Sequence, residues 1–398
     1  MNGKERIALT MQHQAPDRVP VMCQLSFGHY CLNTGLAPHE LWYTSEAMAE
    51  AMVMLQRRYN FDGILVNSPG RPVDILKNAI SIDRDPNGET VHWKNGSSTF
   101  MPWDDMPHFI PAYESKAQRA NFATIDPDHL EAVDDYIGYV WNTYHIQVLP
   151  GKINRGPLDE LPDYFLDTLK LVKTKAGPHV SIHAEVFSPF THFMELFGYQ
   201  DALIGLVTDP YKAHALLNRL TEASIAFALA EVSCGIDALL ISSAFAGAPF
   251  LSRKLYTEFV VPYEKRVTEA VKAAGGIVYT HTCGRIGDRL DLMEATGTQG
   301  IDTLDPPPLG NGDLAVAKRD FGDRLFFKGN MNSVAILDYK TKQEVIAEAT
   351  NRIQIGKPGA GYILSTACSV APRVEPWKLE LLTPLAEEIG RYDDRKGE

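Results

Sequence analysis

The feature that most constrains the fold is an alternation of short apolar segments, many of them β-branched, with longer segments of helical periodicity. This alternation is typical of parallel sheets covered by helices. Eight apolar segments are present, at residues 18–24, 62–67, 181–187, 237–243, 276–283, 300–305, 324–331 and 361–368. Because eight parallel strands close a barrel, we predict an α/β fold, a (β/α)8 TIM barrel formed by residues 1–398 as a single domain.

Segments with helical periodicity occupy most intervals between these strands. The predicted helices are at residues 45–60, 165–176, 209–234, 252–274, 285–296, 312–321, 341–356 and 375–392. Residues 68–164 interrupt the alternation and are rich in Pro, Asp and aromatic residues. We interpret them as a cap insertion after the second strand, over the barrel mouth, with a hairpin at Asn95-Gly96. An independent small domain is the alternative.

The aromatic content of the insertion bears on the substrate. Its aromatic residues include Trp93, Phe100, Trp103, Phe109, Tyr113, Tyr136, Tyr139, Trp141 and Tyr144. A methoxylated aromatic molecule would pack well against such a surface. The alternative is that these side chains form a small core within the insertion.

Composition and charge exclude several classes of partner. The chain has 38 Lys and Arg against 50 Asp and Glu, and its formal net charge is −12. Because an acidic field repels phosphates, we expect neither nucleic acid nor an anionic membrane surface as a partner. No apolar run approaches the roughly 18 residues of a membrane span. The odd number of cysteines, five, and an N-terminus without an apolar signal region predict a cytoplasmic location.

Three potential metal ligands fall at the ends of predicted strands. His281 and Cys283 lie two residues apart, so strand alternation directs both side chains to the same face. Cys368 ends the last predicted strand, and the C-terminal strand ends form the active-site face of a barrel. One imidazole and two thiolates suit zinc, and three protein ligands leave a coordination position for substrate. The pattern predicts a catalytic Zn²⁺ site, with buried scaffold residues as the alternative.

Further polar residues end neighbouring predicted strands. Asp305 precedes three prolines and is the preferred fourth ligand or supporting group, with Asp302 as the other candidate. Asn330 also points toward the predicted mouth. We predict catalytic roles for Asp305 and Asn330; the alternatives are a solvated carboxylate and a turn-forming amide. The cysteines interpreted as structural are Cys23, Cys31 and Cys234.

The sequence resembles the uroporphyrinogen decarboxylase superfamily and, within it, the zinc-containing methyltransferases that exchange methyl groups with corrinoid proteins. The resemblance is carried by residues 4–9, 16–21, 235–238, 281–284, 305–307, 328–330 and 361–364. It implies that His281, Cys283 and Cys368 are the zinc ligands. The residue that precedes the paired prolines is typically Glu in that family, whereas Asp305 is shorter.

The function implied by the resemblance is a zinc-dependent methyl transfer between a small molecule and the cobalamin of a separate corrinoid protein. The favoured reaction is of the O-demethylase type, in which a methoxylated or otherwise methylated donor converts cob(I)alamin to methylcobalamin. The C-terminal region contains no recognisable cobalamin domain, so we expect the corrinoid protein to act in trans.

Other functions stay open at this point. One is a methylcobamide:thiol methyltransferase of the coenzyme M type, in which a metal-activated thiolate accepts the methyl group. The others are a metal-free decarboxylase of the uroporphyrinogen decarboxylase type and a non-catalytic ligand-binding barrel. Decarboxylation is disfavoured because residues 22–30 contain no Arg to bind the carboxylates of a porphyrinogen.

Overall fold

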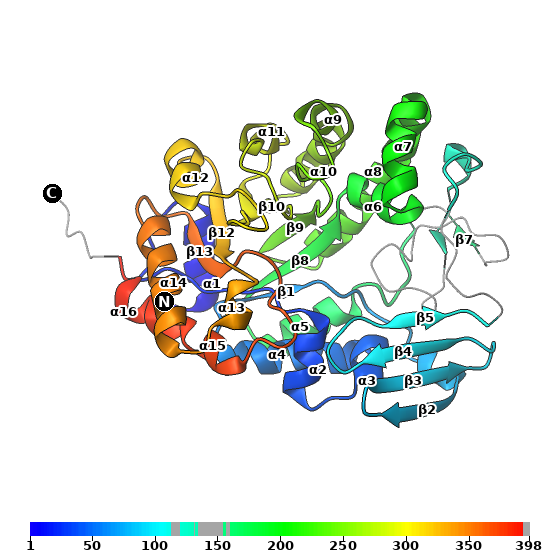
Figure 1. The fold of residues 1–398 in the computed structure, drawn as a ribbon, viewed down its shortest axis with the longest axis horizontal. Coiled ribbons are helices and arrows are strands. Elements are labelled where there is room, and N and C mark those ends of the chain that lie inside the picture. The colour runs from blue at the N-terminus through cyan, green and yellow to red at the C-terminus, as the bar shows by residue number, and fades with distance from the viewer. Residues whose placement is uncertain (113–119, 131, 134–153, 157–159, 393–398) are drawn as a thin grey trace.

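A computed structural model describes residues 1–112, 120–130, 132–133, 154–156 and 160–392 of the chain. Its centre is a curled parallel sheet with helices along its outer side (Figure 1). In order across the sheet, the strands are β1 (Gly63–Val66), β8 (Ser181–Phe187), β9 (Ala238–Ser242), β10 (Val278–His281), β11 (Gly300–Thr303), β12 (Phe326–Met331) and β13 (Tyr362–Thr366). Each predicted strand from 62–67 onward is therefore confirmed, as part of a seven-stranded sheet.

Residues 18–24, predicted as the first strand, form an extended segment without a regular ladder. Val21 makes a single parallel bridge to Leu364 of β13. On the other side, the backbone amide of Asp62 donates to the carbonyl oxygen of Val21 at 2.8 Å. Pro20 has no amide hydrogen to donate, which interrupts the ladder. The prediction of a regular eighth strand is wrong, although the segment hydrogen-bonds on both sides, to β13 and to the residue preceding β1.

A buried ion cluster fixes this extended segment to the sheet. Asp62, which is 4% exposed, accepts from Arg6 at 2.5 Å and from Arg18 at 2.8 Å. It also accepts from the backbone amide of Val21 at 2.7 Å. The carboxylate therefore joins the first helix, the extended segment and β1. Hydrogen-bonded charges of this kind are costly to separate once buried.

The outer helices correspond closely to the predicted ones. They are α4 (Ser45–Tyr59), α5 (Asp167–Ala176), α8 (Pro210–Ser233), α11 (Leu290–Ala295), α12 (Leu314–Phe321) and α14 (Lys342–Gly356). The predicted helix at 252–274 divides into α9 (Arg253–Phe259) and α10 (Val261–Ala273), and that at 375–392 into α15 (Pro376–Glu380) and α16 (Leu382–Ile389). Pro262 and Pro384 stand in the first turns of α10 and α16, where the absence of an amide hydrogen prevents a continuous helix.

The described residues also contain helices that the periodicity did not predict. They are α1 (Gly3–Met11), α2 (Phe27–Thr34), α3 (Pro38–Tyr43), α6 (Pro189–Phe197), α7 (Tyr199–Thr208) and α13 (Ala335–Asp338), with short 3-10 turns at Ile75–Asn78 and Pro127–His129. Nearly all residues of α6 are buried, including Thr191 and His192, so it lacks the solvent-exposed face that marks a surface helix.

The insertion contains a four-stranded antiparallel sheet that lies beside α2 and α3 (Figure 1). Its strands are β2 (Ala79–Asp85), β3 (Gly88–Trp93), β4 (Ser98–Pro102) and β5 (His108–Ile110); a separate pair is formed by β6 (Ala132–Val133) and β7 (Asn154–Gly156). The predicted hairpin at Asn95-Gly96 is confirmed between β3 and β4, where Gly96 has a φ of +84°. Trp93 donates to Thr99 at 2.9 Å and packs edge-on against Tyr43 of α3.

Some of the predicted cap aromatics cannot be placed. Tyr113, Tyr136, Tyr139, Trp141 and Tyr144 lie outside the described residues. Trp93 is buried in the small core between the sheet and α3.

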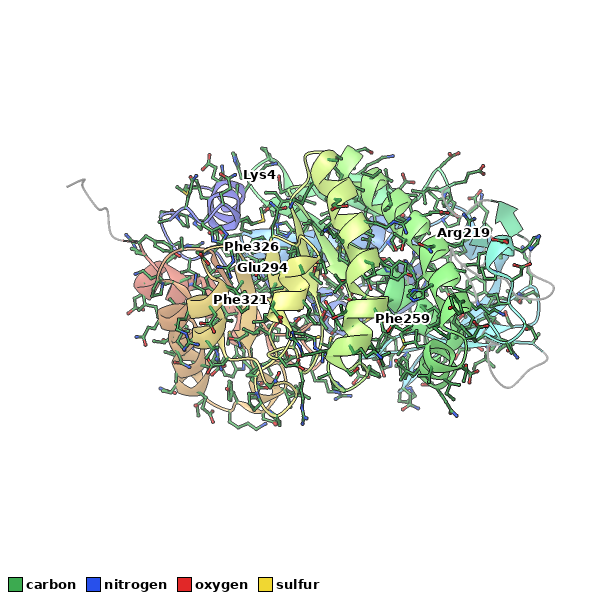
Figure 2. The ribbon with its side chains drawn as sticks, turned by 90° about the horizontal axis from the view of Figure 1, so that it is seen from above. Lys4, Arg219, Phe259, Glu294, Phe321 and Phe326 are labelled. Carbon is green, nitrogen blue, oxygen red and sulfur yellow. The ribbon has the colours of Figure 1, made fainter. Side chains whose placement is uncertain are left out.

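Side chains fill the space between the sheet and its helices (Figure 2). Among the labelled residues, Phe259 of α9 is 1% exposed and belongs to this layer. Phe326 of β12 is fully buried on the inner face of the sheet, where its ring centre lies 5.5 Å from that of Tyr279. In the interior of the sheet, His183 and the hydroxyl of Tyr279 form a hydrogen bond of 2.8 Å. No helix in the described part of the chain combines the length and the apolar character needed to cross a membrane.

Candidate metal and substrate site

Three side chains with nitrogen and sulfur atoms meet at the C-terminal ends of β10 and β13. His281 is the last residue of β10, Cys283 follows it, and Cys368 lies just beyond β13. Their ligand atoms all lie within 4.8 Å of one another. The Nε2 atom of His281 is 3.2 Å from Sγ of Cys283, which is 3.8 Å from Sγ of Cys368. This group could hold a zinc ion.

Two charged residues on neighbouring strands orient His281. Strand register aligns His281 with Asp302 of β11, and Asp302 with Lys328 of β12. Nδ1 of His281 lies 3.2 Å from one carboxylate oxygen of Asp302, and Lys328 donates to the other at 3.0 Å. The carboxylate thereby fixes the ring and leaves Nε2 facing the two sulfur atoms, as is usual for metal-binding histidines.

The two thiols differ in acidity. The hydrogen bond with Cys283, aided by His281 and opposed by burial, holds the pKa of Cys368 well below its usual value. The same hydrogen bond, together with burial, raises the pKa of Cys283. Burial disfavours the charged form of His281, but hydrogen bonds with Asp302 and Cys368 outweigh it and raise its pKa. Cys368 is therefore the thiol that ionises most readily in this group.

Asp305 and Asn330 lie close to the group but outside it. One carboxylate oxygen of Asp305 accepts from the backbone amide of Gly284 at 2.7 Å, and the other is buried without a partner among the described residues. Asn330 donates from its side chain to the carbonyl oxygen of Leu304 at 2.9 Å. These contacts hold the loops after β10 and β11. The supporting contact to His281 comes from Asp302, the second candidate of the sequence, and not from Asp305. The catalytic roles of Asp305 and Asn330 stay predictions.

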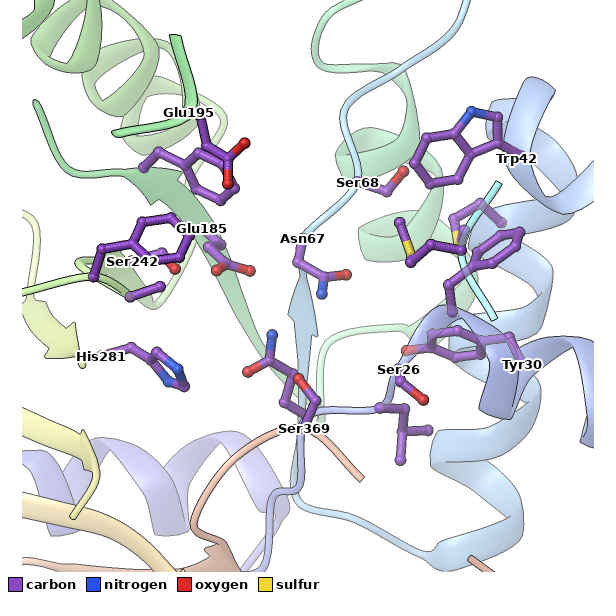
Figure 3. A pocket seen from close by; sticks show the side chains of 18 of the residues that line it. Ser26, Tyr30, Trp42, Asn67, Ser68, Glu185, Glu195, Ser242, His281 and Ser369 are labelled. Atoms are coloured by element: carbon purple, nitrogen blue, oxygen red, sulfur yellow. The ribbon is translucent and has the colours of Figure 1, made fainter. Parts of the chain in front are cut away.

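A cavity of about 370 Å³ opens beside His281 (Figure 3). Its His281 side includes Glu185 and Ser242, while Trp42 and Tyr30 lie across the opening. The apolar lining residues include Leu25, Phe27, Tyr30, Trp42, Met48, Met106, Phe187, Tyr199 and Phe245. The cavity thus combines an aromatic wall with a potential metal at one side, which is typical of small-molecule sites.

The aromatic wall has a different origin from the one predicted. Phe27 and Tyr30 belong to α2 and Trp42 to α3. Among the described insertion residues, the cavity is lined by Ser68, Arg71 and Met106. The described aromatic residues of the insertion therefore do not line this cavity.

The charged residues of the lining are mainly acidic. Glu185 and Glu195 contribute carboxyl groups, and Arg71 is the one Arg or Lys among the described lining residues. Nε of Arg71 donates to the backbone oxygen of Trp42 at 2.8 Å, and its guanidinium lies 5.1 Å from the centre of the Trp42 ring. Arg71 therefore holds Trp42 in place at the wall of the cavity.

Glu185 and Lys328 were not singled out in the sequence. Glu185 lies on β8, and burial raises its pKa to about 7, although His281 and a hydrogen bond with Ser242 oppose this shift. An isolated charge inside an otherwise apolar predicted strand is the signal that both residues carry. The register between strands decides which of these charged side chains become neighbours. That register cannot be predicted from the sequence of a single strand.

Comparisons with known proteins agree with this architecture. The family model for uroporphyrinogen decarboxylase (URO-D) matches residues 151–389. The uroporphyrinogen decarboxylase of Chlorobium limicola is 30% identical over 250 residues, which cover 59% of this chain and 68% of that protein. That of Chlorobium luteolum is 31% identical over 258 residues, with coverages of 60% and 70%. A methyltransferase from Methanosarcina mazei has a similar fold, with a TM-score of 0.69, 17% identity and coverages of 98% and 99%.

Proposed function

Starting from the fact that this chain belongs to the uroporphyrinogen decarboxylase (URO-D) family, we propose that it is a zinc-dependent, corrinoid-linked methyltransferase. It would move a methyl group from a methoxylated or otherwise methylated small molecule to the cobalamin of a separate corrinoid protein. The observation that carries the proposal is the His281, Cys283 and Cys368 group beside the 370 Å³ cavity.

The donor set fits zinc in a catalytic role. One imidazole nitrogen and two sulfur atoms match the preference of this borderline-soft ion, and three ligands leave a position for substrate. When bound, zinc would supply a Lewis acid that polarises the heteroatom carrying the methyl group. Asp302 would keep the imidazole in the tautomer that presents Nε2 to the metal.

The remaining lining residues support a small, largely apolar substrate. Trp42, Tyr30 and Phe27 offer flat surfaces against which an aromatic ring packs favourably. Glu185 and Ser242 provide polar groups on the same side of the cavity as His281. A methyl ether held against the aromatic wall would direct its oxygen toward this polar side.

The same lining argues against decarboxylation of a porphyrinogen. The curated relatives carry the name uroporphyrinogen decarboxylase, and binding a substrate with many carboxylates requires several cations. The described lining has two glutamates and one arginine, whose Nε already donates to a backbone oxygen. We therefore favour methyl transfer over the reaction in the names of those relatives.

The proposal is tested by measuring zinc. Protein purified without chelator should contain about one zinc per chain, and Cys283→Ser and Cys368→Ser should lose it. Cys234→Ser is the matched control, because this half-buried cysteine lies at the end of α8 and should leave zinc unchanged. An absence of zinc in the wild type after reconstitution would overturn the proposal.

The direction of transfer is tested next. Methoxylated donors are incubated with cob(I)alamin, and thiols with methylcobalamin, while the corrinoid spectrum is followed. Formation of methylcobalamin from a methoxylated donor supports the proposal. Methylation of thiols alone would reassign the protein to the thiol methyltransferases.

A further inference from the structure

A second, smaller cavity adjoins the candidate substrate cavity. Its volume is about 20 Å³, which is room for one water molecule. Four residues line both cavities: Asn67, Ser68, Glu185 and Phe187. Glu231 of α8 and His192 of α6 line the small cavity only. Glu185 is therefore the ionisable residue that the two cavities share.

Polar atoms around the small cavity have no partners among the described residues. Both ring nitrogens of His192 are unpaired although the residue is only 1% exposed. The ring lies between Phe187 and Phe227, with centroid distances of 5.6 and 6.1 Å. Oε2 of Glu231 is also buried and unpaired. Because buried polar groups are nearly always hydrogen-bonded, these atoms indicate a missing hydrogen-bonding ligand.

A metal ion does not fit this position. The described residues contain one group of metal-ligating atoms close enough together to share an ion, and it consists of His281, Cys283 and Cys368. Water, in contrast, both donates and accepts, and typically makes about three hydrogen bonds when buried. A carboxyl group and a neutral imidazole each offer complementary positions for it.

We propose that the small cavity binds one ordered water molecule that links Glu231 and His192 to Glu185, and that Glu231 thereby holds a proton in reserve for Glu185. The water site stands on the geometry of the cavity. The use of the proton in catalysis rests on the proposed methyl transfer.

The electrostatics of the three residues agree with this arrangement. Burial raises the pKa of Glu231 well above its usual value, and the proximity of Glu185 raises it further. Burial lowers the pKa of His192 to about 3, so its ring is neutral. The other ionisable groups that act on Glu185 are His281 on β10, Asp302 on β11 and Cys368 beyond β13. Burial and the neighbouring carboxyl group therefore both favour the protonated form of Glu231, while Glu185 is able to exchange a proton near neutral pH.

The reserve proton has a defined use in ether demethylation. The O–CH₃ bond breaks, its electron pair stays on the oxygen, and the methyl group bonds to cobalt through the electron pair of cob(I)alamin. The oxygen needs one proton to leave as an alcohol. Glu185 donates that proton and becomes a carboxylate, and Glu231 then returns a proton to it through the water. Solvent reprotonates Glu231 after the product leaves.

The water site is tested by crystal structures of the zinc-loaded protein and of His192→Phe. We expect an ordered water within hydrogen-bonding distance of Glu231 and His192 in the wild type, and its loss in the variant. His192→Phe should also unfold at a lower denaturant concentration, because the water loses a partner. A cavity without water, or a His192→Phe variant that is more stable than the wild type, would overturn the water site. Either result would show that the ring nitrogens of His192 have no hydrogen-bonding partner.

The proton held by Glu231 is tested by infrared spectroscopy of the zinc-loaded protein at pH 8. The protonated carboxyl band should disappear in Glu231→Gln. Glu264→Gln is the matched control, because Glu264 is another buried glutamate, bonded to Ser243, that lines neither cavity. Burial raises the pKa of Glu264 to about 7, so the band at pH 8 should largely survive in the control. A band unchanged in Glu231→Gln would overturn the proposal.

Catalytic use is tested by single-turnover demethylation with cob(I)alamin. Glu185→Gln should slow the reaction roughly 10²–10⁴-fold. Glu231→Gln should slow it less, and the pH above which the rate falls should be lower than in the wild type. The zinc content and the donor affinity of Glu185→Gln and Glu231→Gln should match those of the control variant Glu264→Gln. A pH profile identical to the wild type would overturn the reserve role. If no donor is demethylated by the wild type, the proposed function and this use of the proton both fail, whereas the crystal structures still decide the water site.

Discussion

The cavity is bordered by two buried ionisable clusters whose hydrogen-bonding states are opposite. In the first, His281, Asp302 and Lys328 follow one register row across three adjacent strands and satisfy one another. In the second, Glu185, Glu231 and His192 come from a strand and two helices, and three of their polar atoms are unpaired. A saturated cluster holds the His281 ring in one orientation, whereas an unsaturated one leaves polar atoms available to bind a further hydrogen-bonding molecule.

The largest effect should follow from breaking the saturated cluster. Lys328→Met removes one of the two cationic partners of buried Asp302 and leaves His281 as the other, so the free energy of unfolding should fall by up to about 3–5 kcal/mol. Urea denaturation of the zinc-free protein measures this change. Arg319→Met is the control, because its ion pair with Asp320 lies on the surface, where water screens it, so the variant should lose little stability. An equally small loss of unfolding free energy in both variants would show that His281, Asp302 and Lys328 do not stabilise the fold as a unit.

One carboxyl group of each cluster, Glu185 and Asp302, should also respond to pH in opposite directions. Burial raises the pKa of Glu185 to about 7, so the folded protein keeps a proton that the unfolded chain releases above its ordinary value near 4.5. The free energy of unfolding should therefore fall as pH rises between these values, by up to about 3 kcal/mol. Glu185→Gln should reduce the decline by the part that Glu185 contributes, as measured by denaturation at pH 5 and pH 8. Glu264, whose pKa burial also raises to about 7, keeps its own part.

Asp302 should change the free energy of unfolding with pH in the direction opposite to that of Glu185. Burial alone would raise its pKa, but Lys328 and His281 outweigh it and lower the pKa, so the stability that it contributes is lost as pH falls. Asp302→Asn should leave in place the part of the decline that Glu185 contributes, although it also removes a partner that raises the pKa of His281. A decline that is as steep in Glu185→Gln as in the wild type would contradict the raised pKa of Glu185.

A smaller effect is expected on zinc affinity. Asp302→Asn weakens the contact that orients the His281 ring, so the dissociation constant for zinc should rise about 10–100-fold. Competition with a chromophoric chelator measures the constant. Retention of wild-type affinity would mean that the strand itself holds the imidazole in place.

The smallest effect should come from Asp305→Asn. This side chain accepts from Gly284 and does not contact the imidazole, and an amide oxygen can replace that acceptor. Zinc affinity should change by less than tenfold in the same chelator competition. A loss larger than that of Asp302→Asn would restore Asp305 as a metal ligand.

Much of this arrangement was predictable because chain order and strand order coincide. Within the seven-stranded sheet, each strand pairs with the next strand of that sheet along the chain, so β1 pairs with β8 and β8 with β9. The C-terminal ends of the predicted strands therefore identify one edge of the sheet. His281, Cys283 and Cys368 could be brought together on that basis. The pairing of Asp302 with His281 and Lys328 depends on register, which shifts with a single residue and leaves no trace in one strand.

The extended segment at 18–24 shows another limit. Its apolar residues predict a strand, but Pro20 removes a backbone donor and the buried carboxylate of Asp62 supplies the fixation instead. The helix α6 was missed because nearly all of its residues are buried, so it lacks the exposed face of a surface helix. In α7 the buried residues include Ala202 and Gly205 while Ile204 and Val207 are exposed, so the large apolar residues do not mark its buried face. The second cluster could not be predicted either, since two of its members lie on α6 and α8 and meet Glu185 only in the folded chain.

The 85-residue separation between Cys283 and Cys368 also has a consequence for biosynthesis. On the ribosome, His281 and Cys283 emerge together, and the third ligand follows only after β11, β12 and β13 have been made. At about 5–20 residues per second, this interval lasts several seconds. A nascent chain thus presents two ligands, too few for a tight structural site, until the last strand is added. If the group binds zinc as proposed, the full ligand set is present only once Cys368 has been made, so chains truncated before β13 would be poor competitors for zinc.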